Sequence, residues 1–259
     1  MPLAPYLAVS HPIPGFLLPI LYSFAMLSQA IEDYLKAIFK LHAGHAVSTK
    51  EISEALDISP ASVTNMVKRL AGMGLVTHQA YHGVSLTEAG RKIALEIIRH
   101  HRLLETYLRE IMGYDWSEMH DEAERLEHHI SEEFEDRLDE MLGYPTHDPH
   151  GDPIPSRAGE VPPVSSDPLT VFPEGRTVLI HRLSDTDPEL LTRLESLGLL
   201  PNVEITLLAK AGDEGPVTVQ VDQDEHILEY NDARHIYASL KQSKQDPDLR
   251  RSTTNEAAG

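Results

Sequence analysis

The sequence predicts a mainly α-helical protein with a smaller β part: an N-terminal winged helix-turn-helix, further helices, and a C-terminal, mostly β, barrel-like domain. Three observations predict this order. Two short capped helical patterns precede a strand–turn–strand pattern, long amphipathic helical patterns follow, and short alternating strand patterns come last. With 259 residues, the chain is long enough for two or three hydrophobic cores.

The composition is that of a globular protein, with 41% hydrophobic and 24% charged residues. The absence of cysteine excludes disulfides, thiolate catalysis and Cys-type zinc sites, so any metal site must use nitrogen and oxygen ligands. Residues 1–108 carry nine Lys/Arg against eight Asp/Glu, whereas residues 109–259 carry thirteen against thirty-three, and the net charge is −19. A near-neutral N-terminal part can present a local basic face to phosphates, and the acidic remainder would attract divalent cations.

Residues 1–27 are apolar and rich in proline. The apolar run over residues 16–27 is too short to span a bilayer, and the segment lacks the Lys or Arg that opens a secretory signal. We interpret the segment as an upstream mis-start or a disordered extension rather than as a membrane or export segment. A cytoplasmic protein without a membrane partner is therefore expected.

The helix-turn-helix is predicted from local capping signals. Residues 31–41 show a helical apolar stripe, and Ser48 with Glu51 forms a capping box that starts a short helix over residues 49–56. Ser59 followed by Pro60 starts a second helix that ends at Gly72 or Gly74. Strand patterns on either side of a turn at residues 81–83 predict the wing.

The second of these helices is the predicted recognition helix. Its first turns and the helix before it offer hydroxyl, amide and cationic groups that suit phosphates and base edges. The candidate DNA-binding residues are Lys50, Ser59, Pro60, Ser62, Thr64, Asn65, Lys68 and Arg69. The core-facing stripe is Val63, Met66, Val67 and Leu70. The alternative interpretation is an ordinary solvated face of a small helical domain.

Three more capped helices are predicted downstream, starting at Thr87, Ser117 and Ser131, the second of them running to residue 130. The stretch from about residue 143 to 173 is rich in Pro, Gly, Asp and Ser and is interpreted as a linker. Residues 176–239 show four short strand patterns and one helix over residues 187–197, which predicts a small β domain.

Histidines and carboxylates recur at helical spacing on two neighbouring helices. They are His101, Glu105, His120, Glu124, Glu127 and His128. The first two are four residues apart, and the other four fall at i, i+4, i+7 and i+8, so each set lies on one helix face. Such carboxylates repel one another unless a cation lies between them. Nitrogen and oxygen ligands of this kind suit Mn²⁺, Fe²⁺ or Co²⁺, and Zn²⁺ is not excluded by affinity order. A solvated acidic helix with incidental histidines is the alternative.

Other functions compete with that of a DNA-binding regulator. A di-iron enzyme needs Glu-x-x-His on two helices, but Arg125 stands three residues before His128. A carboxylate/His metalloenzyme or a metal-storage protein without DNA binding is the alternative function, and a peptide-binding interaction module is a third. The sequence contains no catalytic triad, phosphate loop or dinucleotide fingerprint, so we expect neither an enzyme nor a small organic substrate.

Over roughly residues 28–240 the chain resembles the diphtheria-toxin-repressor family of metal-dependent transcriptional regulators. The motifs that carry the resemblance are EDYLKAIFKL, SPASVTNMVKRL, GLV…GVSLTEAGRKIA, RHHRLLE, HDEAERLEHHISEE and DPHGDPIP, in that order. The resemblance implies a metal-bound homodimer that binds double-stranded operator DNA and represses metal-uptake genes. It also implies about two metal ions per subunit, held by hard nitrogen and oxygen ligands.

The resemblance implies a primary metal site at Asp33, Glu124, Glu127 and His128. Iron-type members carry Met and Cys at the first two positions, whereas the manganese-transport-regulator branch carries Asp and Glu. Because Mn²⁺ prefers oxygen donors, Mn²⁺ is the expected ion, with Fe²⁺ as the alternative. Lys36 departs from the manganese branch, which has a Glu ligand at that position.

The second site maps by resemblance onto His101, Glu105 and His120, with one further ligand from the C-terminal domain. The candidates for that ligand are Asp187 first, then Glu189 or Asp185. The C-terminal part is similar to the SH3-like, ferrous-transport-A-like domain of iron-type members, so the chain combines features of both branches.

The resemblance completes the predicted domain organisation. The domains are an extension at 1–27, a winged helix-turn-helix DNA-binding domain at 28–98, a helical metal-binding and dimerisation domain at 99–145, a Pro-rich linker at 146–173, an SH3-like β-barrel domain at 174–240 and a disordered tail at 241–259.

Overall fold

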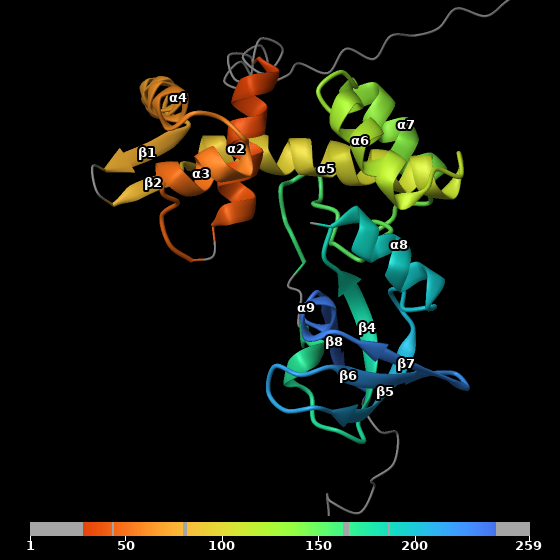
Figure 1. Ribbon diagram of the computed structural model, residues 1–259. Coiled ribbons are helices and arrows are strands. Elements are labelled where there is room, and N and C mark those ends of the chain that lie inside the picture. The colour runs from red at the N-terminus through yellow and green to blue at the C-terminus, as the bar shows by residue number, and fades with distance from the viewer. Residues whose placement is uncertain (1–27, 43, 80–81, 163–165, 186, 242–259) are drawn as a thin grey trace, which may run out of the picture. The chain divides into compact units, whose positions relative to one another are not determined.

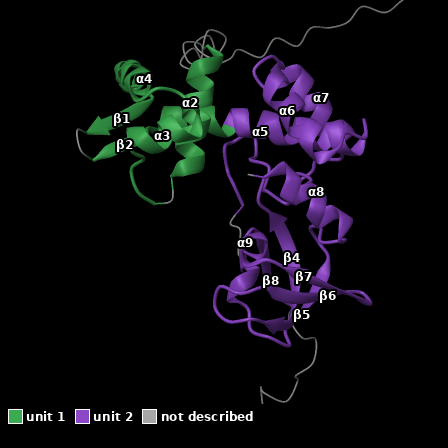
Figure 2. Ribbon diagram, viewed as in Figure 1, with its two compact units in different colours: residues 1–95 green, residues 96–259 purple. Residues whose placement is uncertain are grey.

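The computed structural model describes residues 28–42, 44–79, 82–162, 166–185 and 187–241 (Figure 1). The extension predicted at residues 1–27 and nearly all of the predicted tail lie outside the described residues. The chain divides into two compact units, Met1–Leu95 and Glu96–Gly259 (Figure 2). In the described ranges, no helix is both long and apolar enough to cross a membrane.

The first unit is a winged helix-turn-helix. Its elements are α2 (Gln29–Leu41), α3 (Thr49–Ala55), α4 (Pro60–Gly72), β1 (Val76–Gln79), β2 (Gly83–Leu86) and the first part of α5 (Glu88–Glu110). β1 and β2 pair antiparallel in register from Val76 opposite Leu86 to Gln79 opposite Gly83. The predicted helices and wing are thus confirmed, with ends that differ by one or two residues.

Local capping explains where α3 and α4 begin. The Ser48 hydroxyl accepts from the Glu51 N–H at 3.1 Å, and the Glu51 carboxylate accepts from the Ser48 N–H at 2.8 Å, which is the predicted capping box. The Ser59 hydroxyl accepts from the Ser62 N–H at 3.3 Å, and Pro60 occupies the first helical position.

The apolar stripes of α2 and α4 form the core of this unit. Leu35 and Ile38 of α2 are fully buried, as are Val63, Val67 and Leu70 of α4. The opposite face of α4 is therefore left to solvent, which is the arrangement that a recognition helix requires.

The second unit contains helices and an antiparallel sheet. After the rest of α5 come α6 (Trp116–Leu126), α7 (Glu132–Met141), β3 (Asp167–Pro168), η1 (Leu169–Val171), β4 (Thr177–Leu183), α8 (Pro188–Ser196), β5 (Glu204–Lys210), β6 (Val217–Val221), β7 (Asp224–Leu228), α9 (Tyr230–Ala233) and β8 (Ile236–Leu240). The strand order is β3-β8-β4-β5-β6-β7, all antiparallel. Register shifts in the β4–β8 and β5–β6 pairs bend the strands, as expected of an SH3-like barrel.

The ends of α6 differ from the sequence prediction. The helix is capped by Asp115 rather than by Ser117, because the Asp115 carboxylate accepts from the Ser117 and Glu118 N–H groups at 3.1 and 3.0 Å. The helix ends at Leu126, so Glu127 lies at its C-cap and the chain turns there instead of continuing to residue 130. The prediction of one helix from 118 to 130 was wrong at both ends.

The start of the predicted linker is irregular but packed. Residues 146–156, called here the 146–156 loop, close on themselves through an Asp148 N–H bond to the Asp152 carbonyl at 3.0 Å. The Asp148 carboxylate accepts from the backbone N–H groups of His150 and Asp152 at 3.0 and 2.9 Å. The loop also bonds to β4, where the Leu183 N–H donates to the His150 carbonyl at 2.8 Å. This segment is therefore part of the second unit rather than a free tether.

Candidate metal centre

The second unit gathers predicted ligands from α5 and α6. His101 and Glu105 are one turn apart on α5, and both side chains are buried because this helix face is covered by α6. Glu105 Oε1 lies 3.0 Å from His101 Nε2 and 2.9 Å from Nδ1 of His120 on α6. These three residues form one group of closely spaced potential ligands, as predicted for the second site.

The environment of Glu105 favours its charged form. Burial alone would raise the pKa of this carboxyl, but the attraction and hydrogen bonds of His101 and His120 outweigh it and hold the pKa well below its usual value. A carboxylate that stays ionised between two imidazoles is a suitable ligand for a divalent cation.

A second group lies on the other side of His101. His101 Nδ1 is 2.6 Å from Glu127 Oε2 and 3.8 Å from Glu124 Oε1. Glu127 Oε1 in turn is 3.2 Å from Nε2 of His128. The side chains of Glu127 and His128 are 0% and 2% exposed, although both residues lie at the end of α6. His101, Glu124 and Glu127 are close enough together to share one ion.

Asp148 and His150 of the 146–156 loop form a third group with Glu105, which sequence reasoning missed. Nδ1 of His150 is 3.7 Å from Glu105 Oε2 and 3.8 Å from Asp148 Oδ1, and the ring lies 4.9 Å from that of Trp116. His150 is 1% exposed, and within the described chain neither of its ring nitrogens has a hydrogen-bond partner. A buried imidazole of this kind costs free energy unless something binds it, and a metal ion would do so.

The pKa shifts in this third group suit a cluster that binds a cation. Burial, followed by the charges of Asp152 and Glu105, raises the pKa of Asp148 well above its usual value, and Arg102 only partly opposes this. Burial also lowers the pKa of His150. Both shifts favour the neutral side chains, and a divalent cation would reverse the shift of Asp148 while binding the neutral imidazole.

The ligand expected from the C-terminal domain, Asp187 first and Glu189 or Asp185 behind it, stays a prediction. Asp187 caps α8, where its carboxylate accepts from the N–H groups of Glu189 and Leu190 at 3.0 and 3.1 Å. Neither Asp187 nor Asp185 belongs to a ligand group found among the described residues. Asp185 acts on His150 electrostatically and raises the pKa of that ring, against the effect of burial.

A buried network supports the turn that carries Glu127. His100 lies 3.1 Å from the Glu127 carbonyl through Nδ1 and 3.1 Å from Glu135 Oε2 through Nε2. Arg99 bonds to the other oxygen of Glu135 through Nε and to Asp139 at 2.6 Å. Burial would raise the pKa of Glu135, but the bonds from His100 and Arg99 outweigh it and lower that pKa.

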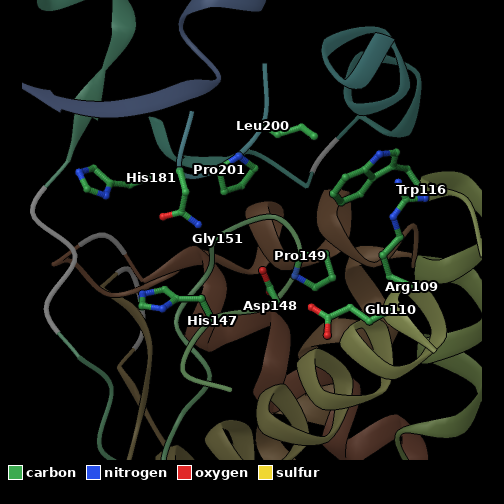
Figure 3. Close-up of a pocket in the computed structure, with 11 residues that line it drawn as sticks. Arg109, Glu110, Trp116, His147, Asp148, Pro149, Gly151, His181, Leu200 and Pro201 are labelled. Atoms are coloured by element: carbon green, nitrogen blue, oxygen red, sulfur yellow. The ribbon is translucent and has the colours of Figure 1, made fainter. Parts of the chain in front are cut away.

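A cavity of about 650 Å³ lies beside the third group (Figure 3). Asp148 and Trp116 line it, together with Arg109 and with His181 of β4. Figure 3 shows the 146–156 loop forming one wall and the ends of α5 and α6 another. Because a bound ion needs a route from solvent, the cavity is a suitable access path to this group.

The remaining predicted site residues lie in the first unit. Asp33 is half-buried on α2, and its approach to Glu127 and His128 stays a prediction. The exposed candidates for DNA contact are Lys50, Ser59, Pro60, Ser62, Asn65, Lys68 and Arg69. Thr64 is half-buried, and its hydroxyl donates to the Pro60 carbonyl at 2.9 Å.

Comparison with known proteins accounts for most of the chain. Residues 26–84 match the family model of the iron dependent repressor N-terminal DNA binding domain, residues 87–156 that of its metal binding and dimerisation domain, and residues 168–240 that of the FeoA domain. The chain is 34% identical over 217 residues to the iron-dependent repressor IdeR of Mycobacterium tuberculosis, covering 79% of this chain and 94% of that protein. The diphtheria toxin repressor of Corynebacterium efficiens is 33% identical over 192 residues, with 70% and 84% covered.

Solved structures similar to this chain are also metal-dependent transcriptional regulators. A manganese-dependent transcriptional repressor in complex with manganese is 37% identical, with a TM-score of 0.75, and the match covers 82% of this chain and all of that one. The manganese regulator SloR is 34% identical, with a TM-score of 0.67 over 82% of this chain and 98% of that one. The metalloenzyme and storage alternatives are thereby set aside. The chain belongs to the family of iron-dependent, DNA-binding repressors, and it is a metal-dependent transcriptional regulator.

Proposed function

We propose that this chain is a repressor of metal-ion uptake genes that is activated by Mn²⁺, with Fe²⁺ as the alternative ion, and that it binds double-stranded operator DNA as a homodimer. The observation that carries the proposal is the series of buried and half-buried carboxylates and imidazoles on α5, on α6 and in the turn after α6, in a protein whose other unit is a winged helix-turn-helix.

The primary centre consists of Asp33, Glu124, Glu127 and His128. The last two face each other at 3.2 Å in the turn after α6. Three carboxylates and one imidazole give a donor set without sulfur, which favours Mn²⁺ over softer ions. Relatives described as manganese-dependent and as iron-dependent both occur, so the ion is inferred from the donor chemistry.

The ancillary centre consists of His101, Glu105 and His120, and we assign Asp148 and His150 of the 146–156 loop to it as well. Glu105 links the two sets, because one of its oxygens faces His101 and His120 while the other faces His150. A further ligand from the C-terminal domain, Asp187 or Asp185, completes this centre, and the charge of Asp185 acts on His150.

Activation is a population shift. Asp33 belongs to the first unit and the other primary ligands to the second, so one ion bound by all four restrains one unit relative to the other. The metal selects the arrangement in which the two α4 helices of a dimer fit successive major grooves. Without an ion, repulsion among the carboxylates favours other arrangements.

A fluorescence-anisotropy titration tests the proposal. The full chain is titrated into labelled DNA from its own promoter and from metal-transporter promoters, with Mn²⁺, anaerobic Fe²⁺, Zn²⁺ or chelator. We expect sequence-specific binding with Mn²⁺ that chelator abolishes. Equal binding with and without metal, or none with any metal, contradicts the proposal.

Variants locate the response in the primary centre. Asp33→Ala and His128→Ala are expected to remove the metal response and to keep the helical circular-dichroism spectrum. The matched control is Glu118→Ala, which removes an exposed carboxylate from the same helix as Glu124 and is expected to leave the response unchanged.

A further inference from the structure

The side chain of His101 lies between the two candidate centres. Its Nε2 faces Glu105 at 3.0 Å in the ancillary centre, and its Nδ1 faces Glu127 at 2.6 Å in the primary centre. His101 belongs to both ligand groups and is 3% exposed, so water does not compete for either nitrogen. The rigid ring therefore connects the two groups directly.

A neutral imidazole has one N–H and one lone pair, on different nitrogens. Were Nε2 of His101 to ligate an ion in the ancillary centre, its lone pair would be engaged there and the ring hydrogen would sit on Nδ1. That N–H would then donate to Glu127 Oε2, whose distance of 2.6 Å is already that of a short, charge-assisted hydrogen bond. The other carboxylate oxygen of Glu127 is left facing His128.

On the basis of the proposed function, we propose that His101 couples the two centres, so that an ion in the ancillary centre raises the affinity of the primary centre for its own ion. A metal-bound histidine commonly donates its second N–H to a carboxylate, and such a bond typically changes metal affinity about 10- to 100-fold. Here the carboxylate is itself a ligand of the next ion, so the same bond serves both centres. Linkage requires the effect to be reciprocal.

The alternative route through His120 is weaker. Its Nδ1 is 2.9 Å from Glu105, but its Nε2 is 3.9 Å from Glu124, which is beyond hydrogen-bond distance. The ring is also 28% exposed, so water can take part. Of the two histidines His101 and His120, His101 therefore has the closer polar contact with the primary centre.

The test is a double-mutant cycle on the full chain, with Mn²⁺ as the probe and free Mn²⁺ counted by electron paramagnetic resonance. Glu105→Gln disables the ancillary centre, and Glu127→Gln identifies the binding events of the primary centre. In the parent chain, Glu105→Gln is expected to lower the affinity of the primary centre about tenfold. In a His101→Gln background, whose side-chain oxygen can still reach the Nε2 position in the ancillary centre but which offers no donor at the Nδ1 position, the same substitution is expected to change that affinity less than about twofold.

His150→Phe is a second way to weaken the ancillary centre, because it keeps a ring against Trp116 while removing both nitrogens. This variant is expected to lower the affinity of the primary centre in the parent chain and not in the His101→Gln background. Thermal melting identifies any variant that fails to fold. An equal loss in both backgrounds, or no loss in the parent chain, overturns the coupling but leaves the proposed function intact. No Mn²⁺ binding by the parent chain overturns the proposed function itself.

Discussion

Asp148 is a residue at which stability and ligand binding oppose each other. Burial and the charges of Asp152 and Glu105 raise its pKa, so the folded chain binds a proton more tightly than the unfolded chain does. Its contribution to stability is therefore most favourable near and below its usual pKa of 3.8 and declines as the pH rises through the higher folded pKa. At neutral pH without metal, the raised pKa of Asp148 therefore makes this buried carboxyl destabilising to the fold relative to the unfolded chain, where it ionises freely.

Asp148→Asn should consequently raise the melting temperature of the metal-free protein at about pH 7 and abolish part of the stabilisation by Mn²⁺. The Asn side-chain oxygen can still accept the two backbone bonds that close the loop. Differential scanning calorimetry with and without Mn²⁺ measures both effects. A variant that melts lower without metal would show that the carboxylate is not under this electrostatic strain.

Gly151 fixes the position of the 146–156 loop against β4. Its φ is +89°, and a Cβ would lie 1.9 Å from the His181 carbonyl oxygen. Gly151→Ala is expected to cost about 3 kcal/mol of unfolding free energy, from the left-handed backbone and the steric clash together. Urea denaturation measures this cost.

Gly175→Ala is the matched control for that variant. Gly175 has a φ of +75°, but no atom of the described residues lies within 4 Å of the position that a Cβ would take, so only the backbone cost of about 1 kcal/mol is expected. Equal losses in the two variants would mean that the loop can move away from β4 easily.

At the scale of elements, Glu135 of α7 supports the end of α6 indirectly. It contacts His100 of α5, and His100 contacts the carbonyl of Glu127, which follows α6. The Glu135 carboxylate pairs with Arg99 and His100 of α5, all nearly fully buried. Glu135→Ala leaves a buried guanidinium with one partner fewer, so we expect a loss of about 3–5 kcal/mol. Glu133→Ala, on the exposed face of the same helix where Glu133 pairs with Arg137, should cost less than about 1 kcal/mol.

The pH dependence of that loss has a defined sign. The folded pKa of Glu135 lies below its usual value of 4.5, so its contribution is present above that pH and disappears as the pH falls through the folded pKa. The difference between the parent chain and Glu135→Ala should therefore narrow in acid. Chemical denaturation at a series of pH values from neutral into acid checks this, and a constant difference would contradict the assigned role.

Elements specified by neighbouring residues were predictable from the sequence. The capping box at Ser48 and the Ser59–Pro60 start depend on residues at most three positions apart, so the helix-turn-helix is specified locally. The strands β3 and β8 were missed because β3 has only two residues and its pairing with β8 joins segments far apart in the chain. The extent of α6 was missed because the Asp115 cap lies ahead of the residue that looked like one.

Helical spacing in the sequence predicts the part of the candidate site that lies on α5 and α6. His101 with Glu105, and His120 with Glu124, follow from the period of α5 and α6. His150 could not be placed in this way, because an irregular loop has no period. Its position depends on packing against Trp116 and on a bond to β4, both of which are tertiary contacts.

At the scale of the whole molecule, a net charge of −19 means that cations act in two ways. Any salt reduces the general repulsion, whereas an ion bound at a site stabilises the folded state by mass action. Mn²⁺ at about a hundred times its dissociation constant should add about 2.7 kcal/mol per site to the stability of the second unit. Mg²⁺ at equal ionic strength should add much less, because it prefers all-oxygen octahedral ligands and holds its water tightly.

Melting curves with Mn²⁺, Mg²⁺ and chelator at constant ionic strength separate these contributions. Equal shifts with the two ions would mean that screening, rather than a site, stabilises the fold.

The candidate centres contain only carboxylate oxygens and imidazole nitrogens, and the chain has no cysteine at all. Peroxide converts a metal-binding thiolate to sulfenic and then to sulfinic acid, which destroys it as a ligand. Oxygen and imidazole donors have no such oxidation ladder. A regulator built in this way keeps its ligands during an oxidative burst, so Mn²⁺-dependent DNA binding should survive a peroxide treatment that would disable a sensor with a thiolate ligand.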